Sequence, residues 1–427
     1  MRTRPHRHAR LALVAIAIAF AASACGSSAT TWAPPSGART APPSAGTASA
    51  STGASAGPDA SADRATYAAI ESQVEALRGL THTTTVSPVL LDSKGVSDWL
   101  TKAFAEQVDH QALADESRLF VHLGLLPAGS SLEQMELALE SSQVVGFYDS
   151  TSKGLYVLSQ SGGVGPTEKI TFSHEYTHAL QDQNFGLDKL ATDTADQGDR
   201  DLARTALLEG DATQLMTQWA TAHMSLPDLL LAQGEALQGG QTDQLSKAPP
   251  ILRESLLFPY QDGLSFVSSI YAAGGWAAVN KVYADPPDST SQILHPELYA
   301  QHVKPVALTV PAVPASLPGW KLTMQDTLGE LQLRIWLEGD AAEGSLSAAV
   351  DQWAGDRVAL YEGPNGEWAV VLKTEWRTAA GATAFAAALP ARLKALGPSR
   401  QCPASTRVDV AIASSQTVIP DLLTCAA

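Results

Sequence analysis

Basic side chains, cysteines and long apolar runs are all scarce in this chain of 427 residues. Lys and Arg number 28 against 44 Asp and Glu, a net charge of −16 that repels nucleic acid, so we expect no nucleic-acid partner. No apolar run reaches the roughly 20 residues of a membrane-spanning helix. The sequence contains no His-rich tract, the feature typical of zinc-uptake proteins, so a role in zinc uptake finds little support. Hydrophobic residues make up 45% of the chain, enough for a core, which excludes disorder throughout.

The N-terminus predicts export. Arginines precede a short apolar run at Leu11–Phe20, which is followed by small residues ending at Ala24. This order is typical of a secretory signal, which we assign to residues 1–24. The next residue, Cys25, resembles the lipidated cysteine of a bacterial lipobox, so we expect a lipid anchor at the outer face of the cell membrane. An ordinary signal followed by a coincidental cysteine is the alternative.

The residues after the signal predict a tether and then a folded body. Gly, Ser, Thr, Ala and Pro dominate residues 25–63, which can bury little and are expected to be disordered. We predict an α+β fold in two parts, a mainly helical body at 64–345 and a small α+β unit at 346–427. Cys402 and Cys425 are predicted to form one disulfide in that unit.

Periodicity predicts the elements. Helical spacing indicates helices near residues 67–77, 100–108, 131–139, 168–183, 199–224, 249–284 with breaks at Pro259 and Gly274, 325–337, 341–354 and 379–396. Strands are expected at 144–148, 155–158, 358–361, 367–376 and 407–413. The first two flank a polar turn and therefore predict a β-hairpin. The Pro-rich stretch 285–320 is expected to be irregular.

One helix carries a candidate metal motif, His174-Glu175-Tyr176-Thr177-His178. Two histidines four residues apart lie on one face of a helix, so both imidazoles can bind one ion. Glu175 projects about 100° from His174 around the helix, where it can reach a water on the metal without being a ligand. A surface helix with charged residues at neighbouring turns is the simpler alternative.

Glu209 is the candidate third ligand. Catalytic zinc sites use three protein ligands and leave one position for water. Glu209 lies on an otherwise apolar stripe of the next predicted helix, and a buried carboxylate is costly unless a cation compensates it. The alternative partner for Glu209 is an arginine such as Arg204.

The pattern of His174, Glu175, His178 and Glu209 resembles the gluzincin branch of zinc metallopeptidases. The Glu-Gly-x-Ala context of Glu209 looks like the third-ligand motif of aminopeptidase-type members. The resemblance implies a zincin-like fold with one catalytic Zn²⁺ bound by the two histidines and Glu209. It also implies that Glu175 is the general base. The hairpin at 142–160 is further implied to offer an edge strand to an extended peptide.

The chain departs from that family in two places. Thirty residues separate His178 from Glu209, more than in compact members, and position 213 is Thr where some members have an acid that orients a histidine. The stretches at 258–263 and 289–296 resemble a family of exported bacterial proteins of uncertain role. Tyr260, His295 and Tyr299 are candidate donors to the oxyanion of the reaction.

We therefore expect an exported, lipid-anchored zinc peptidase that acts on peptides or proteins. The alternative is a catalytically inactive surface lipoprotein that keeps the fold and binds a peptide or envelope partner. The sequence does not specify an oligomeric state.

Overall fold

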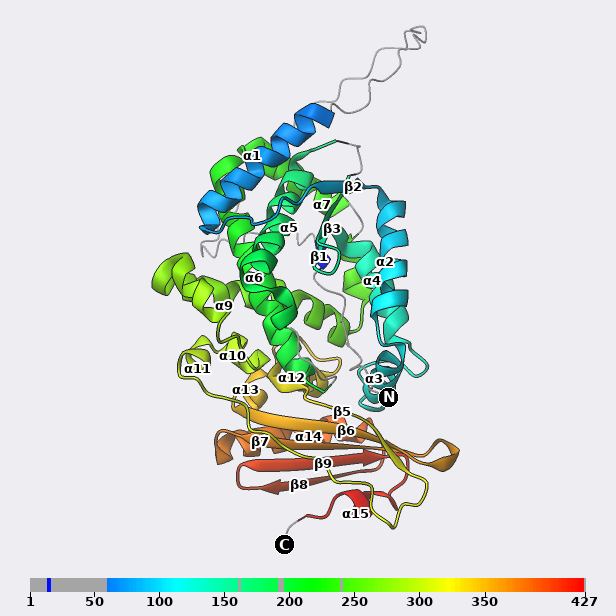
Figure 1. Ribbon diagram of the computed structural model, residues 1–427. Coiled ribbons are helices and arrows are strands. Elements are labelled where there is room, and N and C mark those ends of the chain that lie inside the picture. The colour runs from blue at the N-terminus through cyan, green and yellow to red at the C-terminus, as the bar shows by residue number, and fades with distance from the viewer. Residues whose placement is uncertain (1–13, 17–59, 160–162, 191–195, 239–240, 426–427) are drawn as a thin grey trace, which may run out of the picture.

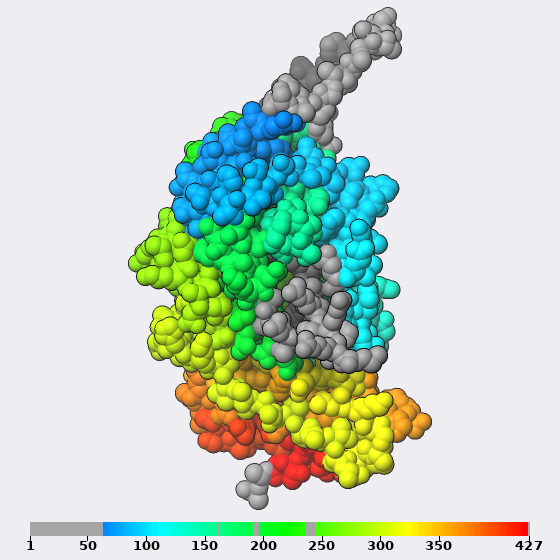
Figure 2. Space-filling model, viewed as in Figure 1, coloured from blue at the N-terminus to red at the C-terminus, as the bar shows by residue number. Residues whose placement is uncertain are grey.

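A helical body stands on a second, smaller layer built around a β-sheet (Figure 1). The computed structural model describes residues 14–16, 60–159, 163–190, 196–238 and 241–425. Figure 2 shows the two parts packed on one another, with the chain drawn in yellow lying across their junction. The predicted α+β class is confirmed. Among the described helices, none is both long and apolar enough to cross a membrane. The predicted cleavage site, Cys25 and most of the predicted tether lie outside the described residues.

Four helices open the described body. They are α1 (Ala60–Arg78), α2 (Ser93–Gln107), α3 (His110–His122) and α4 (Leu132–Gln143). Three were predicted, and Ser131 caps α4 as expected, because its side chain accepts a hydrogen bond from the backbone N–H of Gln134. The sequence prediction missed α3. Helix α1 begins at Ala60, so the expected tether boundary at residue 63 is wrong.

The first sheet has the strand order β1-β3-β4-β2. Strands β3 (Val144–Asp149) and β4 (Gly154–Leu158) form the predicted hairpin. Strand β2 (Pro88–Leu91), which was not predicted, pairs parallel with β4. Strand β1 (Val14–Ile16) pairs antiparallel with β3, although it lies within the predicted signal. Cleavage of that signal would remove β1 and leave β3 at the edge of this sheet.

Three long helices form the centre: α5 (Pro166–Phe185), α6 (Gly198–His223) and α9 (Pro250–Val282). Their positions agree with the predicted helices. The backbone of α9 leaves helical geometry at Gly274 and Gly275, as expected, whereas Pro259 does not break the helix. The shorter helices, of which none was predicted at these bounds, are α7 (Leu226–Gln238), α8 (Gln241–Lys247), α10 (Thr290–Leu294) and α11 (Pro296–Ala300).

Glycines bring α6 and α9 into direct contact. A Cβ atom at Gly210 of α6 would lie 2.2 Å from the carbonyl oxygen of Gly263 on α9. A Cβ atom at Gly263 would lie 2.2 Å from the carbonyl oxygen of Ala206. Only glycine permits such an approach of two backbones. The backbone of Ala206 on α6 therefore lies directly against α9.

The second sheet has the strand order β5-β6-β7-β9-β8. Its strands are β5 (Lys321–Asp326), β6 (Trp353–Glu362), β7 (Trp368–Trp376), β8 (Ser399–Ala404) and β9 (Arg407–Ala413). Its neighbouring helices are α12 (Gly329–Glu338), α13 (Ser347–Val350), α14 (Ala379–Lys394) and α15 (Ile419–Leu422). Helix α14 packs on strands β7, β8 and β9. The predicted disulfide between Cys402 and Cys425 is present, with their Cα atoms 5.1 Å apart.

The start of this sheet corrects two predictions. The helix expected at 325–337 forms as α12 but begins only at Gly329, because positions 325 and 326 belong to β5, which pairs with β6. Most of the helix expected at 341–354 is also absent, since only α13 forms there and Trp353 already begins β6. The sheet unit thus begins at Lys321 and not at residue 346. Strand pairing between distant segments overrides the local helical spacing here.

Candidate metal centre

Helix α5 is the buried axis of the site. Its first turn starts with Pro166, and the Glu168 carboxylate accepts a hydrogen bond from the Gly165 N–H at 3.0 Å. Every residue from Thr171 to Asp182 is buried, because α1, α6, α7 and the first sheet surround the helix. Phe172 stacks near Tyr67 of α1, with ring centroids 4.4 Å apart. The apolar back of the helix packs on the core, as predicted.

His174, His178 and Glu209 converge on one point. The Nε2 atoms of the two histidines are 3.0 Å apart. Glu209 Oε2 lies 3.0 Å from His174 Nε2 and 3.4 Å from His178 Nε2. All three side chains are buried. Two helices thus place three potential ligand atoms at the corners of one small triangle.

The triangle has the dimensions of a tetrahedral metal site. Bonds of about 2.0–2.1 Å to a tetrahedral ion separate neighbouring ligand atoms by about 3.3 Å. The three observed separations bracket that length. Two imidazoles and a carboxylate are also a donor set that zinc accepts. The residues present therefore fit a Zn²⁺ ion with a fourth position open.

Gln181 orients one of the histidines. Its Oε1 lies 2.8 Å from His178 Nδ1, and its Nε2 donates to the backbone carbonyl of Leu208 at 3.0 Å. The second contact determines which way the amide points, so Nδ1 of His178 carries the hydrogen. The Nε2 atom of His178 is then the one left to bind a metal. No sequence pattern identified this orienting partner; its only signal was a polar side chain three residues after His178.

The charge of Glu209 is compensated by the histidines and not by an arginine. Burial by itself would raise the pKa of Glu209, but contact with His178 and His174 lowers it to about 2. Arg204, the alternative partner, donates instead to the carbonyl of Leu190. The arginine alternative is therefore wrong, and Glu209 is an ionised carboxylate whose described ionic contacts are the two imidazoles.

Glu175 lies beside the triangle. Its side chain is fully buried, and neither carboxylate oxygen has a well-aligned hydrogen-bond partner in the described chain. Gly146 of β3 lies against it, since a Cβ atom there would be 3.3 Å from Glu175 Cγ. Burial raises the pKa of Glu175 to about 8, and the negative charge of Glu209 acts in the same direction, whereas the nearby backbone of Tyr148 acts to lower this pKa. A buried carboxyl group with a raised pKa beside potential metal ligands is a candidate acid–base group.

Asp211, two residues beyond Glu209, takes part in a separate buried network. Its carboxylate accepts two hydrogen bonds from Arg78 of α1, at 2.8 and 2.9 Å. It also accepts one from the hydroxyl of Tyr283 at 2.5 Å. The Arg78 guanidinium also lies over the ring of Trp276, 4.4 Å from its centroid. This buried network fixes α6 against α1 and the end of α9, and thereby holds Glu209 in position.

The three candidate oxyanion donors lie in different surroundings. Tyr260 of α9 is buried and stacks on His174, with ring centroids 6.3 Å apart. His295 hydrogen-bonds to Glu330 of α12 at 2.8 Å, and the hydroxyl of Tyr299 donates to the carbonyl of Asp285. Within the described chain, no contact joins His295 or Tyr299 to the triangle. The structure thus brings Tyr260 to the site and the other two elsewhere.

Similarity to a known sequence family is found only for the second sheet and the helices beside it. Residues 320–418 match the sequence model of a domain of unknown function (DUF8575). The match starts next to β5 and ends beyond β9, so it contains none of the residues of the triangle. No curated protein and no solved structure matches the chain.

Proposed function

We propose that this protein is a zinc-dependent peptidase with a zincin-like body. The observation that carries the proposal is the triangle of His174, His178 and Glu209 beside the unpartnered carboxylate of Glu175. The signal at residues 1–24 and the lipobox-like Cys25 support export and a lipid anchor at the outer face of the cell membrane. Peptides or proteins are the proposed substrates.

The residues have separate tasks in this reaction. A zinc ion held by His174, His178 and Glu209 would polarise the scissile carbonyl and lower the pKa of a bound water toward about 7. The Glu175 carboxylate takes the proton of the attacking water and passes it to the nitrogen of the leaving amine. The hydroxyl of Tyr260 is the proposed donor to the oxyanion, because its ring stacks on His174.

The first sheet supplies a path for the substrate. Strand β3 already accepts an extended partner, since β1 pairs with it antiparallel from Val14 to Ile16. Gly146, in the same strand, lies directly against Glu175. An extended peptide that takes the place of β1 would have its backbone held by β3 beside the general base.

Metal content is the first test. We expect about one zinc per chain in purified protein starting at Gly26, and loss of that zinc in the His178→Ala variant. His223→Ala, at an exposed position on α6, is the matched control and should keep its zinc. Absence of zinc from the folded protein after reconstitution would contradict the proposed metal site.

Cleavage is the second test. Glu175→Gln should retain zinc and lower the cleavage of a peptide library by at least about 10²-fold, the range attributed to general acid–base catalysis. Glu106→Gln makes the same substitution at an exposed position of α2 and should leave cleavage unchanged. Zinc binding without any Glu175-dependent cleavage would instead favour the non-enzymatic binding protein.

A further inference from the structure

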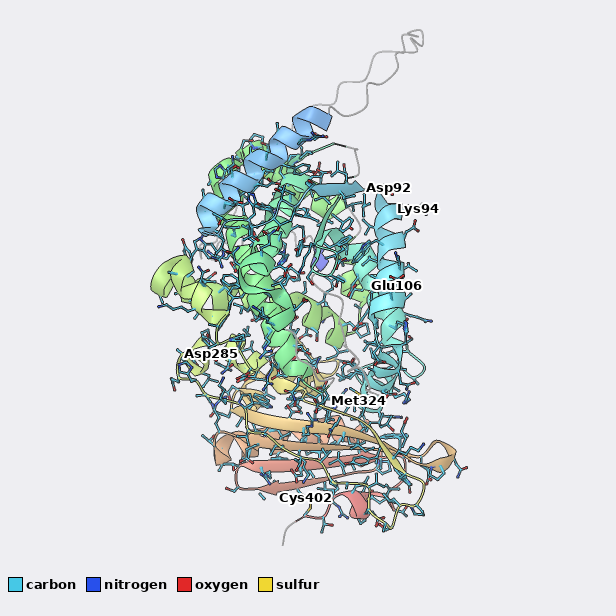
Figure 3. All side chains as sticks on the ribbon, in the orientation of Figure 1. Asp92, Lys94, Glu106, Asp285, Met324 and Cys402 are labelled. Carbon is cyan, nitrogen blue, oxygen red and sulfur yellow. A yellow bond between two sulfur atoms is a disulfide. The ribbon has the colours of Figure 1, made fainter. Side chains whose placement is uncertain are left out.

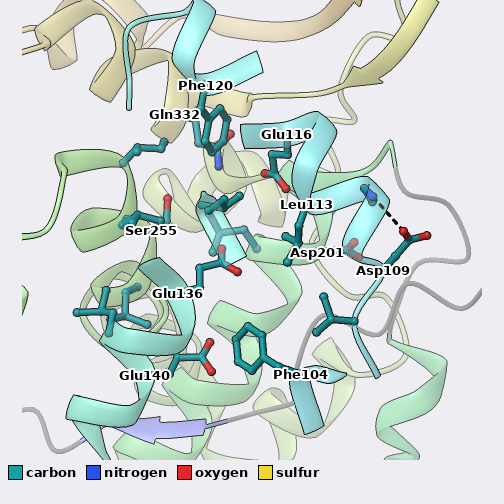
Figure 4. Close-up of a pocket in the computed structure, with 18 of the residues that line it drawn as sticks. Phe104, Asp109, Leu113, Glu116, Phe120, Glu136, Glu140, Asp201, Ser255 and Gln332 are labelled. Atoms are coloured by element: carbon teal, nitrogen blue, oxygen red, sulfur yellow. Dashed lines mark hydrogen bonds between the residues drawn. The ribbon is translucent and has the colours of Figure 1, made fainter. Parts of the chain in front are cut away.

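A cavity outside the metal centre lies among helices α2, α3, α4, α6 and α9, next to the second sheet (Figure 4). Its volume is about 250 Å³. Whole small-molecule ligands typically fill pockets of about 300–1,000 Å³, so this one fits a side chain better than a cofactor. Apolar residues of α2, α3, α4 and α9 form most of its wall, among them Phe104, Phe120, Leu139 and Leu252.

The charged groups of the cavity wall are all of one sign. Five carboxyl groups line it, on α3, α4, α6 and the residue before α3: Asp109, Glu116, Glu136, Glu140 and Asp201. None of the described lining residues is Lys or Arg. Asp109 is used as the N-cap of α3. An apolar wall that carries only negative charge suits a cation on an apolar stem.

Glu140 is the group that indicates a missing ligand. Its Oε2 atom is sealed from solvent and has no hydrogen-bond partner, and the same holds for Ser255 Oγ on the facing helix α9. Figure 4 shows Glu136 and Glu140 projecting from α4 into the space opposite Phe104. Burial and, to a smaller extent, the negative charge of nearby Glu136 together raise the pKa of Glu140 to about 8. A buried carboxyl without a partner costs free energy that a cation in the cavity would offset.

The cavity is adjacent to the metal centre along two helices. On α6, Leu202 lines the cavity and Glu209 belongs to the triangle, seven residues or about 10 Å further along the axis. On α9, Leu256 and Tyr260 are four residues, or about 6 Å, apart. An extended peptide advances about 3.3–3.6 Å per residue, so these spacings along the helix axes correspond to two or three residues of an extended peptide.

We propose that this cavity is a specificity subsite that receives the Lys or Arg side chain of a peptide substrate, with Glu140 as the residue that recognises the cation. The apolar wall takes the methylene stem and the carboxyl group of Glu140 takes the charge. The inference rests on the proposed peptidase function for its substrate class. The test below measures peptide binding and not cleavage, so the cavity assignment and the peptidase function can fail independently of each other.

The test compares peptides that differ only in one side-chain charge. Acetylated, amidated pentapeptides with a central lysine or norleucine are titrated calorimetrically into zinc-reconstituted Glu175→Gln protein. Norleucine keeps the stem and lacks the ammonium group. We expect the lysine peptide to bind at least tenfold more tightly, and an arginine peptide to behave like lysine. Equal affinities for lysine and norleucine would overturn the proposal.

Two further comparisons assign the effect to the cavity. Glu140→Gln should reduce the preference for lysine to threefold or less, and its Tm should show that the protein is folded. Glu106→Gln loses the same charge at an exposed position of α2, labelled in Figure 3, and should keep the full preference. A lysine preference that survives Glu140→Gln would place the cation elsewhere and overturn the assignment.

A free amine serves as a control ligand that distinguishes a subsite for peptides from a site for small amines. n-Pentylamine carries the lysine stem and charge without a backbone, and should bind at least tenfold more weakly than the lysine peptide. Equal binding of the amine and the peptide would overturn the peptide subsite. Lysine selectivity in a protein that cleaves nothing would contradict the peptidase function while leaving the cavity assignment in place.

Discussion

His178 and Gln181 illustrate how a single side chain prepares a ligand atom. The histidine exposes Nε2 to the triangle because its Nδ1 is engaged by Gln181. The amide of Gln181 is itself fixed by the Leu208 carbonyl, on the helix that carries Glu209. One glutamine therefore couples the orientation of a histidine on α5 to the position of the carboxylate on α6. His174 differs, since its Nδ1 has no hydrogen-bond partner in the described chain.

Removing this amide tests its orienting role. Gln181→Ala should weaken zinc binding about 10- to 100-fold, the usual effect of losing a partner of a metal-bound histidine. The measurement is a competition titration against a chelator of known affinity. Gln301→Ala, at an exposed position, is the matched control and should bind zinc as the unsubstituted protein does. A Gln181→Ala affinity within threefold of that of the unsubstituted protein would show that the amide does not orient the ligand.

The contact of α6 with α9 is the feature of element packing on which the site depends. Glu209 on α6 precedes Gly210, whose Cα meets the backbone of α9 at Gly263. Tyr260 lies less than one turn earlier on α9. The two glycines therefore set the distance between the triangle and the ring that stacks on His174. A bulkier residue at this contact must move both helices.

Gly210→Ala tests that contact. The added Cβ would lie 2.2 Å from the Gly263 carbonyl oxygen, so the helices must separate. We expect a loss of about 1–3 kcal/mol in the free energy of unfolding, typical of overpacking, together with weaker zinc binding. Urea unfolding and chelator competition measure the two effects.

Gly234→Ala on α7 is the control, because a Cβ there meets no atom within 4 Å. This substitution should stabilise the protein by up to about 1 kcal/mol, since alanine favours a helix over glycine. Equal stabilities of the Gly210→Ala and Gly234→Ala variants would show that the close contact imposes no constraint.

At the scale of the whole molecule, a buried aspartate joins the helical body to the second sheet. Asp199, in the first turn of α6, accepts hydrogen bonds at Oδ1 from the backbone and hydroxyl of Thr290. Its backbone N–H donates to the carbonyl of Thr327, which follows β5. The other carboxylate oxygen, Oδ2, has no partner. Burial raises the pKa of Asp199 to about 8.

Because this pKa is raised, burial of Asp199 at the junction should lower the free energy of unfolding by an amount that depends on pH. Between about pH 4 and pH 8 the folded chain keeps a proton on Asp199 that the unfolded chain has released, so the free energy of unfolding falls as pH rises through that window. Asn at this position mimics the protonated carboxyl and does not titrate. Asp199→Asn should therefore gain stability relative to the unsubstituted protein from pH 4.5 to pH 8.

Urea unfolding at several pH values checks this prediction. Asp98→Asn, at an exposed position of α2, controls for the loss of one negative charge. A stability difference for Asp199→Asn that is constant from pH 4.5 to pH 8, or that shrinks as pH rises, would contradict the raised pKa.

The sequence by itself determined what depends on near neighbours in the chain. Two histidines one turn apart, a carboxylate on an apolar stripe and the N-cap at Ser131 are all local patterns. They sufficed to predict α5, α6, the hairpin and the three residues that the structure gathers into the triangle. Local patterns succeed here because helix geometry fixes which side chains share a face.

Only the tertiary structure decided what depends on segments far apart in sequence. The pairing of β5 with β6 placed the first two residues of a predicted helix in a strand. The Gln181 contact with Leu208 and the cavity around Glu140 combine residues from separate helices. These features have no periodicity of their own, because hydrogen bonding and packing between distant segments create them. Such contacts exist only after the chain has folded.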